Sequence, residues 1–291
     1  MPCATSDRLS IAGWTVRPVR AAFNTAVFLL KVLPTLPSRP VNWVTPEPIR
    51  HRVYYPTKHG MVEGELTRPG TAGPHPGVLL CLGVVPFGKD HPQVPRLQEA
   101  LARAGFTSLL YWSPAMRDFR LDPIDVENLA LAYAWFIAQP SVNPNRSGFI
   151  GTCVGGAFVL MAAAHHLVRD RVSFVGSFAP YASMRTLAEN IANATRPGAL
   201  GREPWAVDPL TRKTYIHSLT AHMEPSEAGQ LCEGMAEATG RLDPAGLSAE
   251  ARVMLKSKPQ YRGEKMNDSA LRSCRSRLEA EEAFSAVLRI G

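Results

Sequence analysis

The sequence lacks closely spaced pairs of cysteines. It contains five cysteines, none of them in a CxxC motif, and they lie far apart, at Cys3, Cys81, Cys153, Cys232 and Cys274. This spacing argues against a disulfide framework and against a structural zinc site. The glycines also do not form a dinucleotide-binding fingerprint. We therefore expect a cytoplasmic protein, in a reducing compartment, that uses no metal ion and no organic cofactor.

A long apolar run is missing from the N-terminal segment "RAAFNTAVFLLKVLPTLPSRP". Its uninterrupted core extends only from Ala26 to Leu30, and Lys31 ends it. Such a core is too short to span a membrane, and no small-residue cleavage site of a signal peptide follows before Pro34. We expect an amphipathic helix packed on the folded domain. Peripheral contact of this helix with a membrane is the alternative.

A concentrated block of basic residues is also absent. The net charge is +7, but the 32 Lys and Arg residues are spread along the 291-residue chain. No zinc-finger spacing, RNA-binding aromatic signature or basic heptad region accompanies them. The charge therefore indicates a solvated basic surface, and we expect no nucleic-acid partner.

Strand-like and helix-like segments alternate from His51 to Pro180. "RVYYP" and "MVEGELTRP" predict a hairpin, "PGVLLCLG" predicts a strand buried on both faces, and "FTSLLYW", "RSGFIG" and "VSFVGSFAP" predict three further strands. Apolar residues at helical spacing predict one helix that stops at Gly105 and another that ends before Pro140. This order is typical of the α/β class, with a doubly wound, mostly parallel sheet.

The pattern changes after Pro180, where the remaining segments read as helices and no buried strand is evident. We expect an N-terminal helix and linker over residues 1–45, an α/β core over 46–184, and a helical cap and C-terminal region over 185–291. The start of the cap would cover the strand ends, so Tyr181, Met184 and Trp205 are candidates for lining a substrate pocket or for packing within the core.

One cysteine lies among three glycines, in "GTCVGG" from Gly151 to Gly156. A strand ends at Ile150 and a helix begins near Gly155, so Cys153 must occupy a tight, strained turn. The helix N-terminus beside it favours an anion, which would lower the thiol pKa and increase its nucleophilicity. The alternative is that Cys153 is a small buried hydrophobic residue at the start of a helix.

Gly-x-Cys-x-Gly between a strand and a helix resembles the nucleophile elbow of the α/β-hydrolase fold. The longer "GTCVGG", together with "PHPGVLLCLG", is similar to the dienelactone hydrolase family over roughly His51 to Ser183. The resemblance implies hydrolysis of an ester, lactone or thioester through a cysteine nucleophile. It also implies an oxyanion hole made by the N–H groups of Val154 and of the loop after "GVLLCL", at Gly83 or Val84. The family carries a glutamate in this loop, where this chain has Leu82 and Gly83.

The acid and the histidine of a catalytic triad have no convincing candidates. His165 and His166 fall on the helix after the elbow, His217 lies in a helical segment, and Asp208 suits a helix cap before Pro209. Two accounts remain open: a truncated hydrolase whose final strands are missing, or a non-catalytic protein of this fold that binds a small carbonyl ligand.

Overall fold

The computed structural model describes residues 12–33, 39–85, 91–221, 223, 224 and 226. The helices predicted within residues 227–291 lie outside these ranges. In the described part, six strands form one sheet in the order β1-β2-β4-β3-β5-β6. The strands are β1 Ile49–Thr57, β2 Gly60–Arg68, β3 His75–Cys81, β4 Thr107–Leu110, β5 Val142–Thr152 and β6 Phe174–Phe178.

The sheet is mostly parallel. β4, β3, β5 and β6 run parallel to one another, while β1 and β2 form an antiparallel hairpin that joins the sheet through β2 and β4. The hairpin register pairs Thr57 with Gly60, at the turn between the two predicted strands. β3 lies between β4 and β5 and is buried on both faces, as its continuous apolar run predicted.

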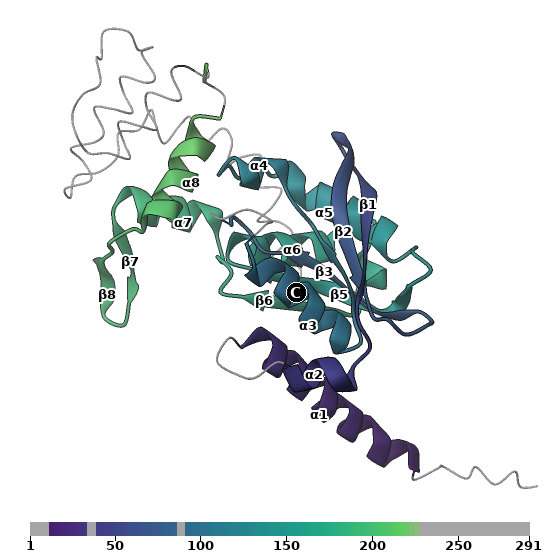
Figure 1. The fold of residues 1–291 in the computed structure, drawn as a ribbon. Coiled ribbons are helices and arrows are strands. Elements are labelled where there is room, and N and C mark those ends of the chain that lie inside the picture. Colours follow the sequence, from purple (N-terminus) through teal and green to yellow (C-terminus); the bar gives the residue numbers. More distant parts are fainter. Residues whose placement is uncertain (1–11, 34–38, 86–90, 222, 225, 227–291) are drawn as a thin grey trace, which may run out of the picture.

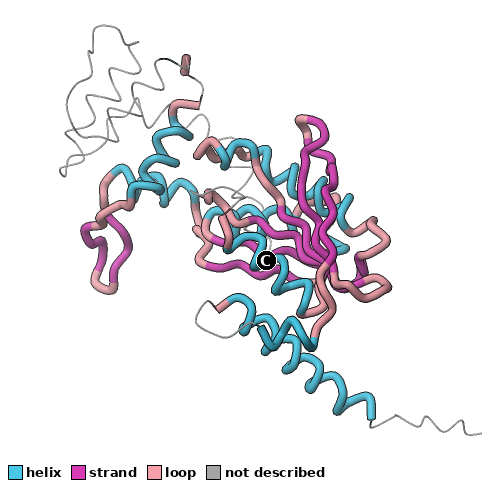
Figure 2. The backbone as a smooth tube through the Cα atoms, viewed as in Figure 1, coloured by secondary structure: helices cyan, strands magenta, loops and turns pink. Residues whose placement is uncertain are grey.

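Helices cover both faces of this sheet (Figures 1 and 2). α3 and α1 lie on one face, and α5 and α6 lie on the other, where their side chains join those of the strands in the largest core cluster. The helices of the core are α3 Gln93–Arg103, the short α4 Pro114–Arg117, α5 Ile124–Phe136 and α6 Val154–Ala164. The predicted fold class, an α/β domain with a doubly wound, mostly parallel sheet, is confirmed.

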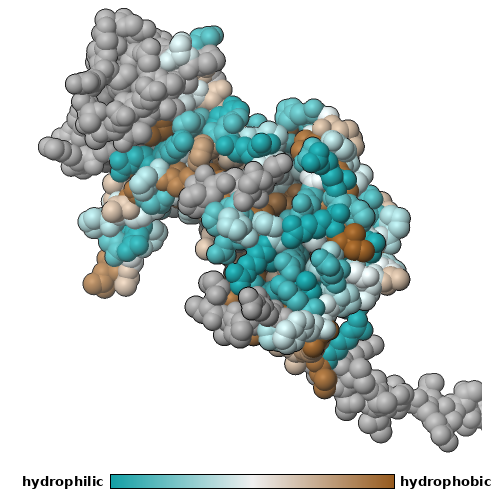
Figure 3. Space-filling view, in the orientation of Figure 1, coloured by the Kyte–Doolittle hydropathy of each residue, from teal (hydrophilic) through white to brown (hydrophobic). Residues whose placement is uncertain are grey.

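The N-terminal helix α1 Ala12–Val32 packs on α3, as predicted, and the short α2 Arg39–Val44 follows it. Val27 is buried in this contact, and the ammonium group of Lys31 lies 2.7 Å from a carboxylate oxygen of Glu99. Arg96 and Arg103 of α3 donate hydrogen bonds to backbone carbonyls of the N-terminal segment. No helix in the described residues is long and apolar enough to cross a membrane. Phe23 of α1 is exposed, and hydrophobic atoms reach the surface over this helix in Figure 3.

The segment after β6, which is called the cap below, projects from the core (Figure 1). It contains α7 Met184–Ala192, the hairpin of β7 Thr195–Gly198 and β8 Gly201–Pro204, and α8 Pro209–Leu219. The two helices were predicted, but the hairpin was not, because its strands are short and largely exposed and so show no buried alternation. Leu200, between the two strands of this hairpin, is fully exposed, and hydrophobic atoms lie at the end of the hairpin in Figure 3.

Candidate active site

Cys153 occupies the turn between β5 and α6, and its backbone lies in the left-handed region with φ 54° and ψ −131°. A residue with a Cβ atom pays of order 1–3 kcal/mol for such a conformation, so the surrounding structure must hold it. The Cys153 N–H donates a 2.9 Å hydrogen bond to the carbonyl of Phe178 at the end of β6. The side chain is exposed. The predicted sharp turn is therefore present, and the alternative of a buried cysteine is wrong.

Close backbone contacts explain the glycines around this turn. A Cβ atom on Gly151 would lie 2.5 Å from the Gly155 carbonyl oxygen, and one on Gly155 would clash with the carbonyl of Cys81. These contacts bring the start of α6 directly against the ends of β3 and β5. The glycine spacing in the sequence is therefore a packing requirement of the elbow.

The predicted oxyanion donors lie on two segments that meet at the elbow. Val154 is the first residue of α6, where backbone N–H groups have no partner within the helix. Val84 follows Gly83 in the loop after β3, and Gly83 has φ +74°. A Cβ atom on Gly83 would lie 3.0 Å from the Thr152 carbonyl oxygen and 3.1 Å from the Gly155 nitrogen, so this loop runs alongside the turn that carries Cys153.

Tyr181 is the side-chain hydrogen-bond partner of Cys153 within the part of the chain that the structure describes. Its hydroxyl oxygen lies 3.9 Å from the sulfur. Burial raises the pKa of Tyr181 to about 12, and the nearby Cys153 and Asp208 side chains add to this rise. The sequence suggested Tyr181 as a pocket residue from its position alone. No local sequence pattern predicts the contact between Tyr181 and Cys153, because the two residues are 28 positions apart.

The predicted histidine candidates lie elsewhere. The His165 and His166 rings pack on each other, 4.3 Å between centroids, at the C-terminal end of α6. His217 lies on α8 against the ring of Phe119, where burial and the charge of Lys213 lower its pKa. The described contacts of these three residues do not bring them to the Cys153 sulfur.

Asp208 caps α8, as its position before Pro209 suggested. Its carboxylate accepts a 2.9 Å hydrogen bond from the Thr211 N–H. Burial opposes ionisation of Asp208, but hydrogen bonds from the Thr211 side chain and from backbone N–H groups at the start of α8 outweigh burial and lower the pKa of Asp208. The carboxylate is therefore charged at neutral pH, close enough to Tyr181 to affect its titration.

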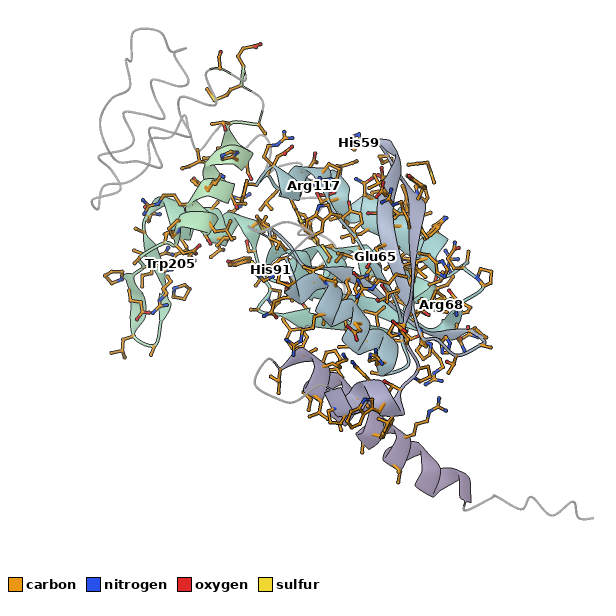
Figure 4. The ribbon with its side chains drawn as sticks, in the orientation of Figure 1. His59, Glu65, Arg68, His91, Arg117 and Trp205 are labelled. Carbon is orange, nitrogen blue, oxygen red and sulfur yellow. The ribbon has the colours of Figure 1, made fainter. Side chains whose placement is uncertain are left out.

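The cap leaves the core at the end of β6 and contacts it again through α8, where Ser218 accepts a 3.0 Å hydrogen bond from the Leu121 N–H. The ammonium group of Lys213 lies 3.6 Å from the centre of the Phe119 ring. Tyr181 and Met184 pack against the main core. Trp205 packs within the cap (Figure 4).

A second thiol, Cys81, ends the neighbouring strand β3 but is fully buried. Burial raises its pKa to about 12. A buried polar cluster lies close to it: the Tyr111 hydroxyl donates a 2.5 Å hydrogen bond to Asp125, and Ser113 donates to the other carboxylate oxygen. Of the two described thiols, Cys153 is therefore the one available to a substrate.

A groove of about 980 Å³ lies between α1 and α3, and His75, Arg146 and Ile150 are among the residues that line it. Cys153, Val154 and Val84 do not line this groove, so it is not part of the candidate site. Among the described residues, no group of three or more His, Cys, Asp or Glu side chains could hold a metal ion.

No protein-family model matches the sequence, and no curated protein matches it. Several solved structures are similar in fold. A hypothetical protein of Pseudomonas aeruginosa, PA2218, has 23% sequence identity and a TM-score of 0.41, over 50% of this chain and 47% of its own. The dienelactone hydrolase-like promiscuous phosphotriesterase P91 from metagenomic libraries has 23% identity and a TM-score of 0.38, over 46% of this chain and 60% of its own.

The thermostable carboxylesterase EstE1, cloned from a metagenomic library, has 19% identity and a TM-score of 0.44 over 76% of this chain and 71% of its own. This chain spans only 47% of the length of PA2218 and 60% of the length of P91. These identities and TM-scores are low, so the similarity concerns the general fold.

Proposed function

We propose that the chain hydrolyses a small carboxylic ester, lactone or thioester with Cys153 as the nucleophile. The observation that carries this proposal is the backbone of Cys153, which holds a left-handed conformation at a strand-to-helix turn and leaves the thiol exposed. Strained residues of this kind concentrate at active sites, where the strain presents a reactive group to the substrate.

The reaction proceeds in two halves. The Cys153 sulfur attacks the carbonyl carbon, and the oxygen becomes an oxyanion that accepts hydrogen bonds from the N–H groups of Val154 and Val84. Collapse of this intermediate expels the alcohol and leaves an acyl group on the sulfur. Water then attacks the thioester and releases the acid. The start of α6 adds positive potential next to both the thiolate and the oxyanion.

The alternative function is a non-catalytic protein of this fold that binds a small carbonyl ligand. It is favoured by the described positions of His217 and Asp208, which respectively pack on Phe119 and cap α8. In this alternative the elbow and the donors at Val84 and Val154 would hold the ligand without cleaving it.

The test uses p-nitrophenyl esters of graded acyl chain length with the wild type and Cys153→Ala. We expect hydrolysis by the wild type only, and an acid-quenched sample should gain the mass of one acyl group on the peptide that contains Cys153. The matched control is Cys81→Ala, which removes the buried thiol of the adjacent strand and should keep the acyl adduct. Equal rates for the wild type and Cys153→Ala would refute the cysteine mechanism, and binding without turnover would favour the alternative.

A further inference from the structure

The Cys153 thiol needs a group that takes its proton, and the described residues around the sulfur supply a tyrosine hydroxyl. Tyr181 follows β6 by three residues and lies 3.9 Å from the sulfur through its hydroxyl oxygen. Hydrogen bonds of catalytic groups are often long in the absence of substrate and shorten in the complex.

A backbone hydrogen bond and side-chain packing hold Tyr181 in the loop after β6. The hydrogen bond from the Cys153 N–H to the Phe178 carbonyl connects the elbow to the end of β6. Ala179 then adopts φ 48°, which turns the chain toward the cap. The Tyr181 ring itself also packs against the main core cluster. The hydroxyl is therefore held close to the elbow by the backbone and by packing.

The protonation state of Tyr181 suits a group that both gives and receives a proton. Burial, followed by the effects of Cys153 and Asp208, raises its pKa to about 12, and a hydrogen bond with the Thr211 side chain opposes this rise only in part. The phenol is therefore neutral at physiological pH. A neutral hydroxyl is both a donor and an acceptor, whereas a phenolate could only accept.

Building on the proposed function, we propose that the Tyr181 hydroxyl is a catalytic proton relay between the Cys153 sulfur and the leaving group of the ester. In acylation, the sulfur forms its bond to the carbonyl carbon, and the thiol proton moves to the tyrosine oxygen. The tyrosine's own proton moves to the leaving oxygen, which takes the electron pair of the breaking C–O bond and departs as the alcohol.

Deacylation runs the relay in reverse. Water forms a bond to the thioester carbon, and its proton moves to the tyrosine oxygen. The tyrosine's proton returns to the sulfur as the C–S bond breaks, which regenerates the thiol. The sum is one ester and one water converted to one acid and one alcohol, and no other reactant is needed.

The leaving group provides a readout that a merely structural role would not change. A p-nitrophenolate leaves without a proton, whereas an alkoxide needs one. We expect Tyr181→Phe to lower kcat/KM about 100-fold or more for the ethyl ester, as is usual for general acid–base catalysis, and less than about tenfold for the p-nitrophenyl ester of the same acid. Tyr54→Phe, at a tyrosine on β1 that is 53% exposed, is the matched control and should leave both rates unchanged.

Each outcome decides between the relay and the proposed function. If Cys153→Ala abolishes hydrolysis while Tyr181→Phe keeps both rates or lowers both equally, the relay is wrong and the cysteine mechanism stands. If the wild type hydrolyses neither ester, or if Cys153→Ala hydrolyses them equally well, both proposals are wrong.

A second measurement tests the same contact without turnover. Alkylation requires loss of the thiol proton, so removal of the group that takes this proton should slow the reaction of Cys153 with iodoacetamide at pH 7 several-fold in Tyr181→Phe. An unchanged rate would overturn the relay. Far-UV circular dichroism and urea unfolding of Tyr181→Phe establish that the variant is folded.

Discussion

A Cβ atom on Gly155 would lie 2.6 Å from the backbone nitrogen of Gly83. The first turn of α6 and the loop after β3 are thus in direct backbone contact, although 72 positions separate the two residues. This contact brings the two predicted oxyanion donors to the same turn, because Val84 follows Gly83 and Val154 precedes Gly155.

The first prediction concerns this contact. Gly155→Ala places a methyl group against the backbone of β3 and of the following loop, which flexible side chains cannot relieve. We expect a loss of about 1–3 kcal/mol in the free energy of unfolding, measured by urea denaturation, and a larger proportional loss of esterase activity as the loop is displaced. Leu160→Ala, an exposed position on the same helix, should cost clearly less. Wild-type stability of Gly155→Ala would contradict the contact.

The second prediction concerns the two described thiols. Burial raises the pKa of Cys81 to about 12, so at pH 7–8 its thiolate is scarce as well as inaccessible. We expect iodoacetamide to modify Cys153 at least 100-fold faster than Cys81 in the folded protein, and both at similar rates in urea. Peptide mass spectrometry over a time course measures this ratio. Comparable rates in the folded protein would mean that Cys81 is not enclosed.

The third prediction concerns the attachment of α1. The Oε1 atom of Glu99 lies 2.7 Å from the Lys31 Nζ and 2.8 Å from the Arg103 Nε. The Lys31 side chain is almost fully buried. Glu99→Gln leaves that ammonium group without its charged partner, so we expect a loss of about 1–3 kcal/mol in urea unfolding and faster proteolysis of α1. The matched control is Glu63→Gln, which breaks an exposed pair with Arg52 and should cost under about 0.5 kcal/mol.

The same ion pair predicts a pH dependence. Burial of Glu99 favours its neutral form, but the hydrogen bonds and charges of Lys31 and Arg103 outweigh burial and lower the folded-state pKa. The stabilisation is therefore present above the ordinary glutamate pKa of about 4.3 and is lost as the pH falls through the lower folded value. The stability difference between the wild type and Glu99→Gln should shrink on acidification, and a difference independent of pH would contradict the assignment.

The fourth prediction concerns the buried carboxylate below the site. Asp125 accepts hydrogen bonds from the Tyr111 and Ser113 hydroxyls, while burial raises the pKa of Asp125. Tyr111→Phe removes one donor from a group that water does not reach, so we expect a loss of about 1–3 kcal/mol in urea unfolding. Tyr54→Phe, exposed on β1, should stay within about 0.5 kcal/mol of the wild type. Equal stability of the two variants would show that the Tyr111 hydrogen bond contributes nothing.

Local patterns were sufficient for the elements of the core. The apolar run of β3 predicted its central place, and Gly105, with φ +91°, ends α3 as the sequence indicated. The exposed β7–β8 hairpin was missed because neither of its faces is buried, so its residues carry no alternating pattern.

The sequence by itself determined the order of the sheet strands and their main connecting helices in the core, and it determined the sharp turn at Cys153, because glycine spacing and hydrophobic periodicity act over a few residues. Only the tertiary structure decided what surrounds the sulfur. It aligned β6 beside β5 and so brought Tyr181 to Cys153, and it placed His217 against Phe119. Such neighbours depend on how distant segments pack side by side, and no short-range pattern in the chain records that packing.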